Sequence, residues 1–156
     1  MSDGIEPATE QVLAASRALV GVAVRSLAVT LDEMTLPQYR ALALLAARGP
    51  LRSGVLAQEL GVHASTLSRT ADRLVAGGWV ERLENPDSRR EVLVRLTAAG
   101  RDVVAQVTAR RAAEIVTVLE RIDPAQREAV VRGFQIFAEA AGEVGPGDLS
   151  RLGVEG

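Results

Sequence analysis

The sequence contains no cysteine, no lysine and a single histidine, at position 63. Without cysteine the chain can form neither a disulfide nor a thiol-based switch. A multi-histidine zinc site needs more ligands than His63 alone can supply. The chain also lacks a glycine-rich phosphate loop, an HExxH helix and a nucleophile elbow. We therefore expect no metal, no cofactor and no enzymatic activity.

Long apolar runs are missing as well, since none reaches the roughly 18 to 20 residues that a membrane-spanning helix needs. Residues 1–11 are acidic and lack the cationic-then-apolar order of a secretory signal. With 156 residues, 47% of them hydrophobic, the chain can bury a core as one domain or two joined subregions. These features predict a soluble, cytoplasmic protein without a membrane partner.

All 18 basic residues are arginine, and the 20 acidic residues give a net charge of −2. The planar guanidinium fork of arginine suits bidentate contacts to phosphate and guanine. A GC-rich genome would favour arginine codons equally well, so we give the absence of lysine no functional weight. Only the placement of the arginines can indicate what they bind.

Helical signals cover most of the chain. Apolar residues spaced by threes and fours predict a long amphipathic helix over residues 9–31. Thr35 and Gln38 fit a capping box that starts a helix running to about residue 47. Thr97 and Asp123 are candidate N-caps for two further helices, over residues 98–122 and up to residue 141. The expected fold class is mainly α with a small β-hairpin.

A helix-turn-helix is predicted in the middle of the chain, from short helices over residues 53–60 and 64–76. Gly61 suits the left-handed position after the first helix, and Ala57 lets the second helix approach closely. An ordinary helical hairpin would show the same spacing. The polar face of the second helix, however, carries short hydroxyls and cations suited to a nucleic-acid backbone or base edge: Ser65, Thr66, Ser68, Arg69 and Arg73. The alternative is that its arginines form surface ion pairs with Asp72 and Glu59.

A two-stranded wing is predicted directly after this helix, from strands at residues 79–83 and 91–96 joined by a polar turn at residues 84–90. In such an architecture the wing tip reaches the minor groove, whose negative potential attracts arginine. Arg89 and Arg90 lie in this turn, and Asp87 could brace Arg89 through an ion pair. A solvated turn is the alternative.

The sequence resembles the multiple-antibiotic-resistance regulator (MarR) family over residues 9–141. The resemblance rests on three segments: MTLPQYRAL (34–42), LAQELGVHASTLSRTADRLVAGGWVER (56–82) and DSRREVLVRLTAAGR (87–101). The last segment matches the family's wing pattern, Asp-x-Arg, a short strand and Leu-Thr-x-x-Gly. Two departures are His63, where the family usually has a Ser- or Asp-like cap, and Arg52 with Ser53 at the start of the preceding helix.

The resemblance implies a winged helix-turn-helix homodimer with long N- and C-terminal dimerisation helices. The implied regions are a dimerisation helix (1–33), a DNA-binding lobe (34–97) and two further dimerisation helices (98–141); the glycine-rich segment 142–156 is expected to be a flexible tail. It places Ser65, Thr66, Ser68, Arg69 and Arg73 on the recognition helix. It also implies that Arg89 enters the minor groove and that Asp87 orients it, while Arg90 suits a phosphate contact.

The resemblance further implies a DNA-binding transcriptional regulator, acting as a homodimeric repressor that a small anionic or phenolic ligand releases from a pseudo-palindromic operator. Apolar stripes on the first and last two predicted helices exceed what one small lobe needs, which favours a dimer independently. Symmetric half-sites would then lie about one helical turn, ~34 Å, apart. The alternative is a winged-helix protein-interaction module without sequence-specific DNA binding; the combination of Arg69 with Arg89 favours DNA.

Overall fold

The structure is a computed structural model that describes residues 4–86 and 88–142, with Arg89 and Arg90 described by their backbone alone. Six α-helices, one 3-10 turn and three strands follow one another in this part of the chain. They are α1 (Ile5–Leu27), η1 (Thr30–Asp32), α2 (Leu36–Arg48), β1 (Leu51–Arg52), α3 (Ser53–Leu60), α4 (Ala64–Ala76), β2 (Val80–Asn85), β3 (Ser88–Leu96), α5 (Ala98–Glu120) and α6 (Pro124–Ala140).

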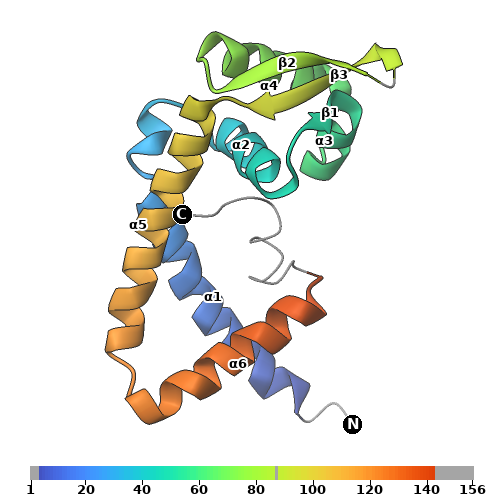
Figure 1. Ribbon diagram of the computed structural model, residues 1–156. Coiled ribbons are helices and arrows are strands. Elements are labelled where there is room, and N and C mark those ends of the chain that lie inside the picture. The colour runs from blue at the N-terminus through green and yellow to red at the C-terminus, as the bar shows by residue number, and fades with distance from the viewer. Residues whose placement is uncertain (1–3, 87, 143–156) are drawn as a thin grey trace.

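Figure 1 shows two regions joined by α5. Helices α2, α3 and α4 and the small sheet form a lobe at the top, which we call the winged lobe, and α5 descends from it beside α1 to the crossing helix α6. The sheet is antiparallel with strand order β1-β3-β2. The expected fold class, mainly α with a winged helix-turn-helix, is confirmed. No helix within the described ranges has the length and apolarity to cross a membrane.

The hydrophobic core lies in the winged lobe and extends into the upper part of α5. Leu42 of α2, Val94 of β3 and Val107 of α5 are completely buried. The core holds residues from every helix of the lobe: Tyr39, Ala41, Leu45, Leu56, Ala57, Leu67 and Leu74. Because Val107 belongs to this core, the first half of α5 is fixed to the lobe by packing.

The expected helix over residues 9–31 is wrong at both ends, since α1 begins at Ile5 and ends at Leu27. The chain then tightens into η1, where the carbonyl of Thr30 accepts hydrogen bonds from the amides of Glu33 and Met34. This turn places Met34, only 4% exposed, in the core. Tertiary burial therefore ends the helix where the local pattern would continue it.

The predicted wing is confirmed, but its strands are longer and its turn shorter than expected. Strand β2 runs to Asn85 and β3 begins at Ser88, and these two residues pair across the turn. The third strand, β1, was not predicted, because two residues are too few to show any alternation. It pairs Leu51 with Val94 and Arg52 with Leu93, so it attaches the start of α3 to the wing.

The junction between the wing and α5 is centred on Thr97, the predicted N-cap, which is confirmed. Its hydroxyl accepts a hydrogen bond from the Gly100 amide at 3.1 Å and donates one to the Gly78 carbonyl at 2.6 Å. Its own amide donates to the Trp79 carbonyl at 3.0 Å. One residue thus joins the end of β3, the start of α5 and the chain that follows α4.

Polar contacts also fix the lower helices. The Arg25 guanidinium donates two hydrogen bonds to one Glu114 oxygen, at 2.9 and 2.8 Å, and so joins α1 to α5. These bonds raise the pKa of Arg25 and lower the pKa of Glu114. The predicted Asp123 cap is confirmed by its bond from the Ala125 amide, at 2.8 Å. Arg127 Nε donates to the carbonyls of Leu119 and Ile122, which satisfies the end of α5.

Gly100 gives a test of the junction. A Cβ at this position would collide with the Trp79 carbonyl, which the Thr97 amide already engages. Gly100→Ala should therefore lower the free energy of unfolding by about 1–3 kcal/mol, the usual cost of overpacking. Gly54→Ala is the control, because nothing lies within 4 Å of its added Cβ. Chemical denaturation measures both variants, and equal stability for the two would contradict the close approach seen at Gly100.

Candidate nucleic-acid interface

The second helix of the helix-turn-helix, α4, has one buried and one exposed face. Leu67, Ala71 and Leu74 are at most 3% exposed and pack into the lobe. Gly61 has φ 66°, the left-handed conformation expected of it, and the Val62 amide bonds the Ala57 carbonyl at 3.0 Å. These features hold the two helices at a tight turn. The opposite face is exposed throughout and holds all the predicted recognition-helix residues: Ser65, Thr66, Ser68, Arg69 and Arg73.

The acids near this face have other partners. Asp72 pairs with Arg82 of β2 at 2.7 Å, and Glu59 pairs with Arg48 at 3.4 Å. The alternative that these two acids neutralise Arg69 and Arg73 is therefore wrong. No residue within 4–86 or 88–142 forms an ion pair with Arg69 or Arg73. The exposed face of α4 keeps its cations available for an anionic partner.

His63 lies at the N-cap of α4 and makes no side-chain capping bond. A Ser or Asp there would accept a bond from a backbone amide of the first turn. The departure from the family pattern noted in the sequence therefore leaves the first turn of α4 without a side-chain cap. The helix starts at Ala64 as predicted, because the buried face formed by Leu67, Ala71 and Leu74 stabilises it.

The wing contains a large irregularity. Glu84 pairs with Val92, but the next pair is Asn85 with Ser88, so residues 89–91 of β3 have no counterpart on β2. A bulge of this kind re-aims the residues it contains. Arg89 and Arg90 both lie in it, although their side chains and all of Asp87 fall outside the described structure. The predicted bracing of Arg89 by Asp87 therefore stays a prediction.

The contacts that hold the C-terminal end of the bulge, at Glu91, were not predicted from the sequence. Glu91 Oε2 accepts a hydrogen bond from Asn85 Nδ2 at 3.1 Å and lies 3.4 Å from Arg52 Nη1. Asn85 is only 5% exposed. The Ser53 hydroxyl also donates to the Val92 carbonyl, at 3.4 Å. No spacing signal could reveal these contacts, because the partners lie on separate elements.

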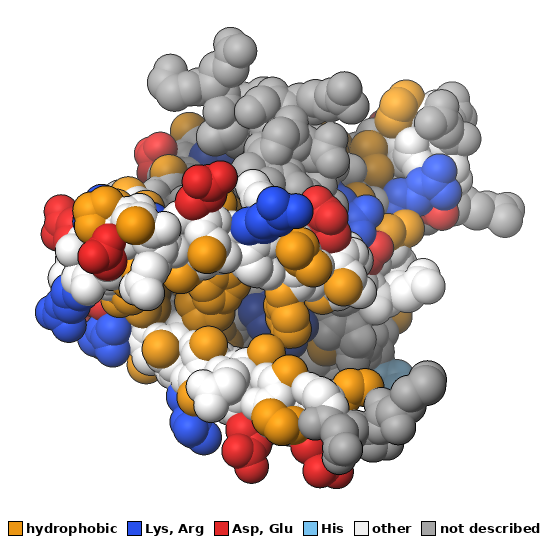
Figure 2. All heavy atoms as spheres, turned by 90° about the horizontal axis from the view of Figure 1, so that it is seen from below, with side chains coloured by type: hydrophobic (Ala, Val, Ile, Leu, Met, Phe, Trp, Pro, Cys, Tyr) orange, Lys and Arg blue, Asp and Glu red, His pale blue; other side chains and the backbone are white. Residues whose placement is uncertain are grey.

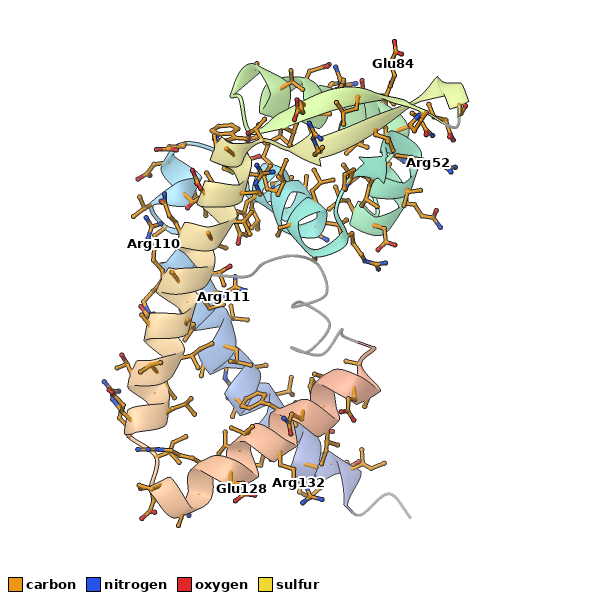
Figure 3. All side chains as sticks on the ribbon, in the orientation of Figure 1. Arg52, Glu84, Arg110, Arg111, Glu128 and Arg132 are labelled. Atoms are coloured by element: carbon orange, nitrogen blue, oxygen red, sulfur yellow. The ribbon has the colours of Figure 1, made fainter. Side chains whose placement is uncertain are left out.

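A second cationic cluster lies below the winged lobe on α5. Arg110 Nη1 and Arg111 Nε are buried and have no hydrogen-bond partner among the described residues (Figure 3). Burial raises the pKa of the Tyr39 phenol, and the nearby charge of Arg111 opposes that rise. Buried guanidinium nitrogens without partners are uncommon because they forfeit hydration. No group of three or more potential ligands within the described ranges could hold a metal ion.

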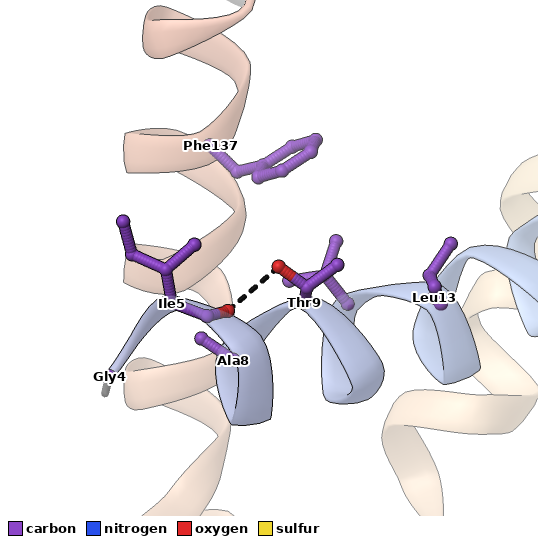
Figure 4. Close-up of a pocket in the computed structure, with 7 residues that line it drawn as sticks. Gly4, Ile5, Ala8, Thr9, Leu13 and Phe137 are labelled. Carbon is purple, nitrogen blue, oxygen red and sulfur yellow. Dashed lines mark hydrogen bonds between the residues drawn. The ribbon is translucent and has the colours of Figure 1, made fainter. Parts of the chain in front are cut away.

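The lower region exposes a large apolar surface. None of the residues of α6 is buried, and its Phe134, Ile136 and Phe137 are 46%, 59% and 55% exposed. Figure 2 shows hydrophobic side chains gathered on the face seen from below. Figure 4 shows Phe137 above α1, where a groove of about 410 Å³ is lined by Gly4, Ile5, Ala8, Thr9, Val12, Leu13 and Phe137.

Comparisons with known proteins agree with this geometry. The MarR family model matches residues 34–92, which cover the helix-turn-helix and most of the wing. The chain is 43% identical to RV1404 from Mycobacterium tuberculosis, a solved structure, over 90% of this chain and 96% of that one, with a TM-score of 0.82. It is also 38% identical over 74 residues to the multiple antibiotic resistance protein MarR of Escherichia coli, covering 47% of this chain and 51% of that protein.

The structure of NadR in complex with 4-hydroxyphenylacetate is also similar, at 25% identity over 84% of this chain and 89% of that one, with a TM-score of 0.61. The chain belongs to the MarR family of transcriptional regulators.

Proposed function

We propose that this protein is a homodimeric repressor that binds a pseudo-palindromic operator and leaves it when a small anionic or phenolic molecule binds. The observation that carries the proposal is the exposed face of α4, on which Arg69 and Arg73 stand among hydroxyls without an acidic partner in the described structure. The two acids near this face, Asp72 and Glu59, pair with other arginines and so do not neutralise it.

DNA recognition divides between α4 and the wing. In the proposed complex α4 lies in the major groove, where Arg69 reaches guanine or phosphate and Ser65, Thr66 and Ser68 approach the backbone or base edges. Arg73 contacts a phosphate from the last turns of the helix. Arg89 enters the adjacent minor groove with Asp87 orienting it, and Arg90 contacts a phosphate. The DNA-binding lobe is residues 34–97.

Dimerisation uses residues 1–33 and 98–141. Phe134, Ile136 and Phe137 on α6 and the apolar face of α1 are too hydrophobic and too extensive for a surface facing water. A second copy of the chain supplies the same apolar face, so a two-fold contact covers both. The dimer places two copies of α4 on one face of the duplex, ~34 Å apart for half-sites one helical turn apart.

The effector is proposed to bind beside Arg111, under the winged lobe. Its carboxylate or phenolate would supply the acceptor that the buried Nε of Arg111 lacks within the described structure. Tyr39, whose phenol lies close enough to sense the charge of Arg111, belongs to α2 and so to the lobe. A ligand between α2 and α5 would favour one position of the lobe over another, which changes operator affinity.

The wing is tested by Arg89→Ala. Losing one minor-groove or phosphate contact should weaken operator binding and lower the slope of log K against log salt by about 0.9 per contact removed. Fluorescence anisotropy over a salt series measures both quantities, using a duplex enriched by selection from genomic fragments. Arg121→Ala, which removes the same charge beside α6, is the control. Wild-type affinity and slope for Arg89→Ala would refute the wing assignment.

The dimer is tested by Phe137→Asp, which places a charge on the apolar face of α6. The wild-type chain should sediment as a dimer at micromolar concentration and the variant as a monomer, because a charge buried without a partner opposes association. Val55→Asp, on the exposed side of α3, is the matched control and should remain dimeric. A folded wild-type monomer at that concentration would rule out the dimer.

The effector site is tested with 4-hydroxyphenylacetate as a probe of the aromatic carboxylate class. At saturating concentration the probe should raise the thermal midpoint of the wild-type chain, because it binds the folded state alone. Arg111→Ala should lose this rise, while Arg121→Ala should keep it. Differential scanning fluorimetry records all three, and an equal rise in the Arg111 variant would place any ligand elsewhere.

A further inference from the structure

The bulge at residues 89–91 raises a physical problem. Three residues without counterparts on β2 leave the strand ladder locally open, and a bulge with no other support would let the chain take several paths. The proposed minor-groove and phosphate contacts need Arg89 and Arg90 to leave the wing from one place. Something other than strand pairing must therefore hold this segment.

The contacts of Glu91 meet this need. Its carboxylate contacts two other elements: Asn85 at the end of β2, at 3.1 Å, and Arg52 of β1, directly before α3, at 3.4 Å. Asn85 is nearly fully buried, so this side of the contact is fixed. Arg52 is itself held by its pairing with Leu93 of β3. The end of the bulge is thus attached to both the wing and the helix-turn-helix.

Electrostatics alone would not favour an acid here. A carboxylate on a hairpin that approaches DNA repels phosphates and lowers affinity. Glu84, another acid on the distal part of the wing, points away from the sheet on the opposite face from Arg52 (Figure 3) and forms no ion pair with any described residue. The two acids therefore carry the same charge on the same hairpin, but of these two Glu91 is the one whose carboxylate contacts both β2 and β1.

We propose that Glu91, held by Asn85 and Arg52, is a positioning residue for DNA binding. It fixes the path of the bulge and hence the point at which Arg89 and Arg90 leave the wing, relative to α3 and the recognition helix. The inference rests on the proposed function for its consequence in DNA binding. The network itself can be tested without DNA.

The DNA arm compares Glu91→Ala with Glu84→Ala, since each removes one wing carboxylate. If charge alone mattered, both variants would bind the operator equally or more tightly than the wild-type chain. A positioning role predicts instead that Glu91→Ala binds the operator about two- to fivefold more weakly, the range expected for a partly exposed ion pair. Its salt slope should fall by up to about 0.9 per lost arginine contact. Glu84→Ala should show neither change.

The second arm measures backbone order in the free protein. Nuclear magnetic resonance relaxation should show lower order parameters for the amides of residues 88–91 in Glu91→Ala, with those of α4 unchanged. Glu84→Ala should match the wild-type chain. Arg52→Glu combined with Glu91→Arg keeps the net charge and can re-form the ion pair, so it should restore order that Glu91→Arg alone loses.

The two arms separate the possible failures. If Glu91→Ala behaves like Glu84→Ala in operator affinity and salt slope while Arg89→Ala weakens binding, the positioning role is overturned and the proposed function stands. Unchanged order parameters in Glu91→Ala overturn it as well. If no duplex is enriched and Arg89→Ala has no effect, the proposed function fails; the relaxation data then still decide whether Glu91 fixes the bulge.

Discussion

The hydrogen bonds of Thr97 hold together the parts of the molecule that must act as one. Its hydroxyl bridges the Gly78 carbonyl, just after α4, and the Gly100 amide, in the first turn of α5, while its amide holds the Trp79 carbonyl. The ends of four elements therefore meet at one residue: α4, β2, β3 and α5. Because Val107 of α5 is also part of the lobe's core, α5 and the winged lobe are rigidly joined over the upper turns of the helix. A displacement of α5 would then move α4 and the wing together, which is the kind of coupling a regulator needs.

In the described part of the winged lobe several acids are paired with arginines, whereas Arg69 and Arg73 of α4 form no ion pair. Glu81 pairs with Arg95 across β2 and β3, at 2.7 Å, and Asp72 pairs with Arg82. Such exposed pairs contribute little to stability. Their larger effect is to neutralise negative charge locally on the winged lobe. A net charge of −2 is therefore compatible with a nucleic-acid interface, since the interface depends on local placement rather than on the total.

Much of the fold could be predicted because its signals are local. Gly61, Thr97 and Asp123 act within a few residues of themselves: Gly61 ends α3, Thr97 starts α5 and Asp123 starts α6. The errors arose where distant residues decide: η1 forms because Met34 is buried in the core, and β1 exists only through its pairing with β3. For the candidate site, the exposed face of α4 follows from helical periodicity. The Glu91 contacts could not be predicted, since Arg52 lies in another strand. The DNA contacts of Asp87, Arg89 and Arg90 stay predictions.

Trp79 is the single tryptophan of the chain, and its position gives it a use beyond packing. Its ring lies against the Cα of Gly77, its carbonyl accepts from Thr97, and its side chain is half-buried beside the lobe's core. The tryptophan fluorescence of the protein therefore comes from the point where the wing meets α5. Its emission reports the local environment of this joint without a label, and a ligand or partner that altered the packing around the ring would register there as a spectral shift.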